Sequence, residues 1–382
     1  MLDRPLISTL EAVGPETGKM QVLLAQLVQA GYPRIEPAIL QDASHFLDLG
    51  GEDIRASLYF TSDRGGAELC LRPEFTIPVC RAYLDSRRGG EAASFSYCGP
   101  VFRFRAGEPD EFIQAGLESF GRTDAAAADA EILGLALEAA TGAGAPSLAT
   151  TFGDAGLLAQ LLDALKLPPT WQRRLKRGLD KGETPSVILA AAPTQSGDHA
   201  GVLAALAGTD ATGARALVDD LLSIAGITSV GGRSATEIAE RFLSQVAMRS
   251  APPFGEEQRA VLDRFLAIAG HPDEAATDLR RLAAEAGLDL GTALDLFEER
   301  ISFMAVHGVD LATVSFSGSF GRKLDYYTGF VFECRNPTAS IGPVVGGGRY
   351  DRLAQSLGSK VAVPAVGAAI WVDRLHGGEL AS

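Results

Sequence analysis

Polar side chains recur beside short strand-like runs at four places in this sequence. The four segments lie at 71–76, 102–103, 112–118 and 322–327. Side chains two residues apart on a strand face the same way, so Gln114 and Glu118 would project together past Gly116, which would leave room for a ligand. Glu74 and Thr76 have the same two-residue spacing. The segments therefore predict a binding cleft if the fold makes them neighbours.

The chemistry of these groups suits an amino acid. The two carboxylates, the Gln114 amide and the Thr76 hydroxyl offer acceptors for an ammonium group, and the planar guanidinium of Arg322 suits a carboxylate. Each segment taken alone also has a plainer interpretation. These are a surface turn at 72–74, a solvated sheet face along 114–118, and a tyrosine pair with a capping aspartate at 325–327.

The elements that must position these residues alternate between helical and strand-like patterns. We expect a helix over 20–28 ended by Gly31, strands at 57–61, 68–71 and 94–97, a hairpin with strands at 102–105 and 112–113, a helix over 124–140, mostly helical segments over 157–307, and strands at 313–316, 330–334 and from 366 onward. The apolar run at 187–192 predicts a buried strand, and the three glycines at 346–348 predict a turn.

This order predicts an α+β fold, an antiparallel sheet flanked by helices and interrupted by a mainly helical insertion. The expected core comprises 1–145 and 310–382, and the insertion 146–309. A formal charge of -14 disfavours binding to nucleic acid. The four cysteines show no C-x-x-C spacing and the histidines lie far apart, so we expect free thiols and no metal site. No signal peptide or apolar membrane-spanning run is present, which predicts a soluble, cytoplasmic protein.

The motifs and their order resemble the catalytic core of class II aminoacyl-tRNA synthetases, and histidyl-tRNA synthetase in particular. The matching segments are 31–37 for motif 1, 99–121 for motif 2 and its loop, 322–329 for the histidine-specific segment, with Lys323 in place of a glycine, 347–353 for the approach to motif 3, and 364–375 for motif 3. The resemblance covers 14–140 and 310–376. It implies the class II synthetase-like sheet.

The resemblance also implies a histidine pocket. Glu74, Thr76 and Gln114 would hold the α-amino group, and Arg322 would meet the carboxylate. Glu118 and Tyr327 would read the imidazole, whose neutral form offers one donor and one acceptor. The complete implied set of histidine-binding residues is Glu74, Thr76, Arg103, Gln114, Glu118, Arg322, Tyr326, Tyr327 and Tyr350, the last of which would close the pocket.

The nucleotide half of the resembled site is degenerate. The matching positions are Phe75, Glu108, Asp110, Glu111, Trp371 and Arg374. The three loop carboxylates would repel a triphosphate, Trp371 would fill the space of adenine where the synthetases have a glycine, and Phe75 also replaces a glycine. Arg103 and Arg374 are retained. We therefore expect no catalytic residue, no cofactor and no metal.

Only eight residues follow Arg374, so we expect no anticodon-binding domain and no tRNA partner. The sequence is thus similar to the truncated synthetase paralogues that serve as regulatory subunits of ATP phosphoribosyltransferase. That resemblance implies a homodimer through the motif 1 region, a hetero-octamer with the short-form catalytic subunit, and histidine feedback on the first step of histidine biosynthesis. Two alternatives are a stand-alone histidine-activating, adenylate-forming enzyme and a ligand-free assembly scaffold.

Overall fold

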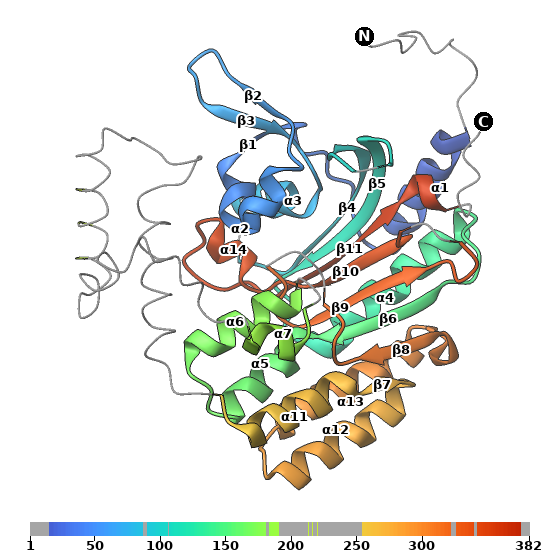
Figure 1. Cartoon of the computed structure of the whole chain (residues 1–382). Helices are drawn as coiled ribbons and strands as arrows, with labels where there is room; N and C mark the ends of the chain where they lie inside the picture. The colour runs from blue at the N-terminus through green and yellow to red at the C-terminus, as the bar shows by residue number, and fades with distance from the viewer. Residues whose placement is uncertain are drawn as a thin grey trace. The chain divides into compact units, whose positions relative to one another are not determined.

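The computed structural model describes most of the chain (Figure 1). The described residues are 15–86, 90–105, 107–180, 183–190, 254–321, 326–339 and 342–375, together with Gly213, Ala216 and Asp220. The chain divides into two compact units, one formed by Met1–Gln160 with Phe265–Ser382 and the other by Leu161–Arg264. The second unit is shorter than the insertion expected over 146–309, because strands and helices from both ends of that range belong to the first unit.

The first unit is built on an eight-stranded sheet. Its strands, in spatial order, are β4 (Ala93–Phe102), β5 (Glu111–Phe120), β11 (Ala365–Trp371), β10 (Val345–Arg349), β9 (Phe330–Arg335), β6 (Ala149–Asp154), β8 (Val314–Ser317) and β7 (Ala269–Gly270). Neighbouring strands are antiparallel except β6 and β8, which run parallel. The mixed α+β fold agrees with the sequence-based prediction, and β6 is the strand that draws the start of the expected insertion into the core sheet.

Helices cover both faces of this sheet (Figure 1). On one face α4 (Ala125–Gly142) packs on β5, β10 and β11, with α1 (Pro15–Gln29) and α13 (Gly291–Val306) against it and α12 (Pro272–Ala286) beyond α13. On the other face lie α2 (Ser44–Arg55), α3 (Thr76–Asp85), α14 (Leu353–Ser356) and a small sheet of β1 (Leu40–Asp42), β3 (Glu68–Leu71) and β2 (Phe60–Ser62). The helix predicted to be stopped by Gly31 ends at Gln29, and Gly31 in the turn that follows has φ +92°, a conformation that favours glycine at a helix end.

The predicted hairpin is confirmed, but its first strand ends at Phe102 and the strand expected over 103–105 is wrong, because these residues belong to the connecting loop. The predicted turn at 346–348 is also wrong. β4 and β5 pair along their whole length, but the three glycines lie inside β10, between β9 and β11. At positions 347 and 348 a larger side chain would collide with atoms of the neighbouring residues. A Cβ on Gly347 would lie 2.2 Å from the carbonyl oxygen of Gly367, and one on Gly348 would lie 2.9 Å from the ring of Tyr327.

The second unit and its borders are helical where they are described. The helices are α5 (Ala155–Ala164), α6 (Pro169–Asp180), α7 (Pro185–Ala190) and α11 (Glu256–Ala267). The strand predicted at 187–192 is wrong as far as residue 190, because this run continues a helix that begins at Pro185, and Val187 is 55% exposed. A short apolar run does not by itself distinguish strand from helix. Residues 191–192 lie outside the described part.

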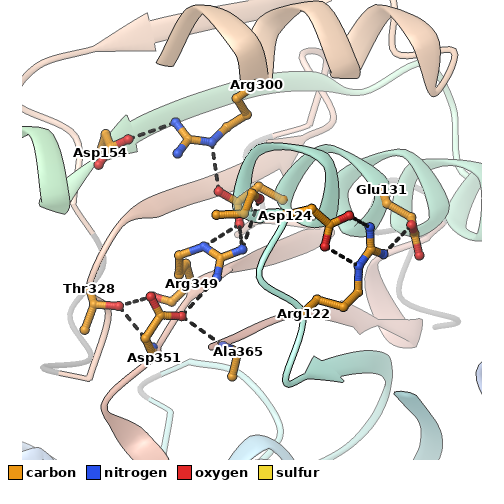
Figure 2. A network of polar contacts seen from close by, with 11 residues as sticks. Arg122, Asp124, Glu131, Asp154, Arg300, Thr328, Arg349, Asp351 and Ala365 are labelled. Carbon is orange, nitrogen blue, oxygen red and sulfur yellow. Dashed lines mark hydrogen bonds and ion pairs between the residues drawn. The ribbon is translucent and has the colours of Figure 1, made fainter. Parts of the chain in front are cut away.

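A buried ion network joins the sheet to the helices on the α4 face (Figure 2). Asp129 of α4 accepts hydrogen bonds from Arg300 Nε at 2.9 Å and from Arg349 Nε at 2.8 Å. Arg300 also donates to Asp154 at the end of β6, at 2.8 Å, and Arg349 to Asp351, at 2.9 Å. Asp129 and both arginines are almost fully buried, so these pairs fix α4 and α13 against β6 and β10.

All four cysteines are buried free thiols. None of the helices that the structure describes is long and apolar enough to cross a membrane.

Candidate functional site

A cleft opens on the sheet face opposite α4, between the ends of β5, β10 and β11 and the start of α3. It contains about 380 Å³ of space, including its open mouth. Seven of the predicted histidine-binding residues line it, namely Glu74, Thr76, Arg103, Gln114, Tyr326, Tyr327 and Tyr350. Arg322 lies outside the described residues. The tertiary structure therefore brings together residues separated by up to 276 positions in the sequence.

The floor of the cleft is made of very small residues, and one wall is an indole. Gly346, Gly367 and Ala369 line the cleft, as does Trp371. Trp371 is directly opposite Gln114 in the pairing of β11 with β5 and is 6% exposed. Small residues therefore line one part of the cleft, and the indole of Trp371 lines another.

Glu74 is held by the beginning of α3. Its two carboxylate oxygens accept the backbone N–H groups of Thr76 at 2.6 Å and Ile77 at 2.9 Å. These are donors that a helix N-terminus leaves free, so the carboxylate is fixed in place. Burial raises the pKa of Glu74, against the lowering effect of these two hydrogen bonds. Each oxygen keeps a lone pair for a cation in the cleft.

Gln114 presents a polar atom with no protein partner. Its side chain is 2% exposed, and its carbonyl oxygen is buried without a hydrogen bond. A buried acceptor without a partner costs free energy comparable to a lost hydrogen bond. Because Gln114 lines the cleft, a ligand donor placed there would satisfy it.

Glu118 lies directly beneath the cleft. Its carboxylate accepts hydrogen bonds from the hydroxyl groups of Thr76 at 2.8 Å, Tyr97 at 3.3 Å and Tyr350. Burial raises the pKa of Glu118 to about 8, against the hydrogen bonds that lower it. Both oxygens are occupied by protein donors, so in this structure Glu118 orients Thr76 and Tyr350 rather than lining the cleft itself.

Two glycines close to Glu118 make room for protein side chains rather than for a ligand. Gly116 was expected to leave room for a ligand, but a Cβ there would lie 2.3 Å from the hydroxyl of Tyr97, which fills the space. Gly367 leaves room for Glu118 itself, since a Cβ there would lie 1.6 Å from its Oε2. Tyr97 was not among the site residues predicted from the sequence. It lies directly opposite Gly116 in the β4–β5 hairpin, and this pairing of a tyrosine with a glycine could have indicated its position.

The tyrosines of the segment after 325 join the cleft and the core. Tyr326 and Tyr327 are each 8% exposed, with ring centroids 4.8 Å apart, and Tyr326 meets Tyr350 edge-on at 5.8 Å. Asp325, the capping residue of the plainer interpretation, lies outside the described residues. The tyrosine pair is thus part of the core and also a wall of the cleft.

The loop carboxylates do not form one repulsive cluster. Glu108 accepts hydrogen bonds from Arg374 and Arg105, each at 2.6 Å. Asp110 accepts the hydroxyl of Tyr59 at 2.5 Å and the backbone N–H of Arg105 at 3.1 Å. Glu111 is exposed at the first position of β5. Arg105 was not among the predicted site residues, although it lies beside the loop in the same strand-like run as Arg103.

Phe75 is a core residue behind the cleft. It is 1% exposed, its ring stacks on Tyr97 with centroids 4.3 Å apart, and the Arg72 guanidinium lies 4.1 Å from the centroid of the Phe75 ring. Arg72 is itself buried and donates to the backbone oxygens of Pro37 and Pro100. The segment at 72–74 is therefore not a surface turn.

Residues 15–375 match the family model described as histidyl-tRNA synthetase. The ATP phosphoribosyltransferase regulatory subunit of Mesorhizobium japonicum is 42% identical over 352 residues, which is 90% of this chain and 92% of that protein. The chain belongs to this family of regulatory subunits. The family member from Brucella canis is 40% identical over 350 residues, covering 90% of this chain and 92% of that one.

Solved structures show the same fold. A Bacillus halodurans protein described as an ATP phosphoribosyltransferase regulatory subunit/histidyl-tRNA synthetase superimposes with a TM-score of 0.69 at 22% identity, covering 98% of this chain and 82% of that one. A histidine–tRNA ligase subunit from Alicyclobacillus acidocaldarius gives 0.59 at 24% identity, covering 99% and 97%. The class II synthetase-like fold is confirmed, and membership of the regulatory family supports a non-catalytic subunit.

Proposed function

We propose that this chain is the regulatory partner of a short-form ATP phosphoribosyltransferase catalytic subunit in the cytoplasm, and that it takes part in histidine feedback on the first step of histidine biosynthesis. Family membership supports the regulatory role. The chain itself would carry out no chemical step. Its contribution would be to favour an active or an inactive state of the assembly.

The cleft is proposed to hold free histidine. The observation that carries this proposal is the buried carbonyl oxygen of Gln114, which has no hydrogen-bond partner in the protein and faces a cleft that also contains Glu74. An amide oxygen beside a carboxylate suits an α-ammonium group. The phenol groups of Tyr326 and Tyr327 line the same cleft and offer donors and acceptors to an imidazole.

The competing proposal of a histidine-activating enzyme is disfavoured by two contacts. Trp371 stands in the cleft beside Gln114, where a purine base would need space. Arg374, which the resemblance assigns to phosphates, is already paired with Glu108. Histidine-dependent ATP–pyrophosphate exchange by the purified chain at a synthetase-like rate would contradict the proposed function.

Assembly is proposed to follow the pattern implied by the resemblance, a homodimer through the region at 31–37 within a hetero-octamer. For histidine to act by feedback, it must bind the inactive assembly more tightly than the active one, since a ligand with equal affinity for two states shifts neither. Copurification with a short catalytic chain, followed by a phosphoribosyltransferase assay with and without this protein and with histidine added, tests these statements together.

Calorimetry on the isolated chain and on the assembly separates a histidine sensor from a ligand-free scaffold. We expect heat with histidine and a loss of affinity of about tenfold or more in Gln114→Met, because the methionine removes the acceptor and keeps the volume. Histidinol, which lacks the carboxylate, and the des-amino analogue of histidine report on the two ends of the ligand. Absence of heat at saturating histidine in both the chain and the assembly would favour the scaffold.

A further inference from the structure

Two tyrosines of the cleft lie just outside the strands beside them. The registered pairing of β9 with β10 ends at Val331 and Gly348. Tyr327 precedes β9, Tyr350 follows β10, and both line the cleft. The pairing of these two strands therefore does not reach either tyrosine, and other contacts must fix the backbone that carries them.

Thr328 supplies these contacts from the side of β9. Its backbone N–H donates to the carbonyl oxygen of Arg349 at 2.8 Å. Its hydroxyl oxygen accepts the backbone N–H of Asp351 at 3.0 Å (Figure 2). The two contacts fall on the residues immediately before and after Tyr350, and Thr328 itself immediately follows Tyr327. One residue therefore fixes the backbone on both sides of Tyr350 relative to Tyr327.

Asp351 ties the same backbone to β11. Its Oδ1 accepts the backbone N–H of Ala365, the first residue of β11, and Nη1 of Arg349, each at 2.9 Å (Figure 2). The N–H of Tyr350 donates to the carbonyl oxygen of Ala365 at 2.7 Å. Tyr350 is thus held from two directions, by β11 on one side and by Thr328 on the other.

We infer that Thr328 and Asp351 are positioning residues of the cleft, which hold Tyr350 where its hydroxyl meets Glu118 and its ring lines the cleft. Neither is among the described residues that line the cleft, so they act on a ligand through the tyrosines. Groups that bind a ligand must be held within about 0.5 Å of their working geometry. Where it concerns histidine, this role rests on the proposed function, whereas the contact of Tyr350 with Glu118 exists without a ligand.

The test removes the hydroxyl of Thr328 and keeps its shape. Thr328→Val cannot accept the N–H of Asp351, whereas Thr328→Ser keeps the hydroxyl and should rescue the wild-type behaviour. Thr151→Val is the matched control. Thr151 is another half-buried threonine of the first unit, its hydroxyl lies 3.3 Å from that of Ser315, and it is not among the described residues that line the cleft.

The titration of Glu118 reports the position of Tyr350 without a ligand. The Tyr350 hydrogen bond lowers the pKa of Glu118, against the raising effect of burial. Displacing the hydroxyl should raise that pKa further, so that the stability that Glu118 contributes is lost at a higher pH. Unfolding at a series of pH values measures this. Each variant is compared with the same variant carrying Glu118→Gln, because Glu74, Cys80 and Tyr97 also interact with Glu118.

Thr328→Val should raise the pH at which Glu118 loses its proton in the folded chain by about half a unit or more. Thr328→Ser and Thr151→Val should match the wild type, since neither disturbs the backbone around Tyr350. Asp351→Asn should shift the titration in the same direction, and it takes the place of Thr328→Val if that variant does not fold. An unchanged titration in a folded Thr328→Val, or an equal shift in Thr151→Val, would overturn the inference.

Histidine affinity, measured by calorimetry on the same samples, tests the effect on the cleft. We expect Thr328→Val to bind histidine about fivefold or more weakly than the wild type, and Thr328→Ser to restore the affinity. Equal histidine affinities in the wild type and Thr328→Val would also overturn the inference. Failure of the wild type to bind histidine would instead remove the proposed function, and the titration of Glu118 would then decide the positioning role alone.

Discussion

The hydroxyl of Tyr350 donates a hydrogen bond to the fully buried carboxylate of Glu118, which joins the residue after β10 to the last part of β5 beneath the cleft. Glu118 also holds Thr76, the first residue of α3. The carboxylate thus ties together three elements that form the cleft. Because Glu118 is fully buried and its pKa is raised, its titration should be measurable as a change of protein stability with pH.

Replacing Tyr350 by phenylalanine should destabilise the fold by about 1–3 kcal/mol, because a buried acceptor loses its donor. The pKa of Glu118 should rise further, since the lost hydrogen bond favours the charged form. Denaturant unfolding measures the stability. Tyr59→Phe is the control, because Tyr59 donates to Asp110 at the exposed surface and its loss should cost about 0.5 kcal/mol or less. Equal losses in the two variants would contradict the buried role of Tyr350.

Glu118 should make stability depend on pH in an unusual direction. Burial raises its pKa from 4.5 in the unfolded chain to about 8 in the fold, so the native state binds more protons between these values. The stabilisation is complete below the lower value and is lost as the pH rises through the higher one. Wild-type stability should therefore fall relative to that of Glu118→Gln by up to about 1.4 kcal/mol per pH unit in this window.

Unfolding at a series of pH values from about 5 to 8 measures this difference. Glu111→Gln, which removes an exposed carboxylate, should keep the wild-type slope. Parallel curves for the wild type and Glu118→Gln would show that the carboxyl group titrates as it does in the unfolded chain.

Asp129→Asn should be among the most destabilising single-atom changes in the chain. Asp129 pairs with both Arg300 and Arg349 and its side chain has no exposure to solvent. Breaking a buried pair by removing one partner costs about 3–5 kcal/mol. Asp124→Asn offers the matched control, since Asp124 pairs with Arg122 but its side chain is 54% exposed. A surface pair contributes about 0–1 kcal/mol. Thermal unfolding of both variants measures the two losses. A loss in Asp129→Asn no larger than that in Asp124→Asn would show that the buried network does not stabilise the fold.

Trp371→Gly should lose about 3–5 kcal/mol of stability, as expected for a large buried aromatic side chain. It should also allow the cleft to bind adenosine, a probe without phosphates whose binding is independent of Glu108. Trp171→Gly is the control, because Trp171 is comparably buried, at 9% exposed, and belongs to the other unit. Adenosine binding by the wild type, or its absence from a folded Trp371→Gly, would show that the indole does not block the base.

The parts of the structure that follow from short-range sequence were predicted well. Examples are the β4–β5 hairpin, α1, which ends at Gln29 shortly before Gly31, and α4. These elements depend on strand alternation, turn residues and helical periodicity, which act between neighbours in the chain. The strand expected at 187–192 was wrong over 187–190, the part that the structure describes, because an apolar run of this length fits either element and the preceding Pro185 favours the first turn of a helix.

The site required contacts over long distances in the sequence. The glycines of β10 resemble a turn in isolation, but they are small because Gly367 and Tyr327 lie against them. The charges of the loop before β5 were visible in the sequence, whereas the partner of Glu108 is Arg374, 266 residues later. Repulsion was therefore predicted where the structure shows an ion pair.

The sequence by itself determined the family, the α+β class and the identity of the residues that surround the cleft, because these depend on the order and type of residues along the chain. The tertiary structure alone decided that Glu118 supports the cleft from beneath, that Tyr97 occupies the space beside Gly116, and that Glu108 lies between two arginines. Burial, pairing and free space are properties of neighbours in three dimensions, and only the folded chain specifies those neighbours.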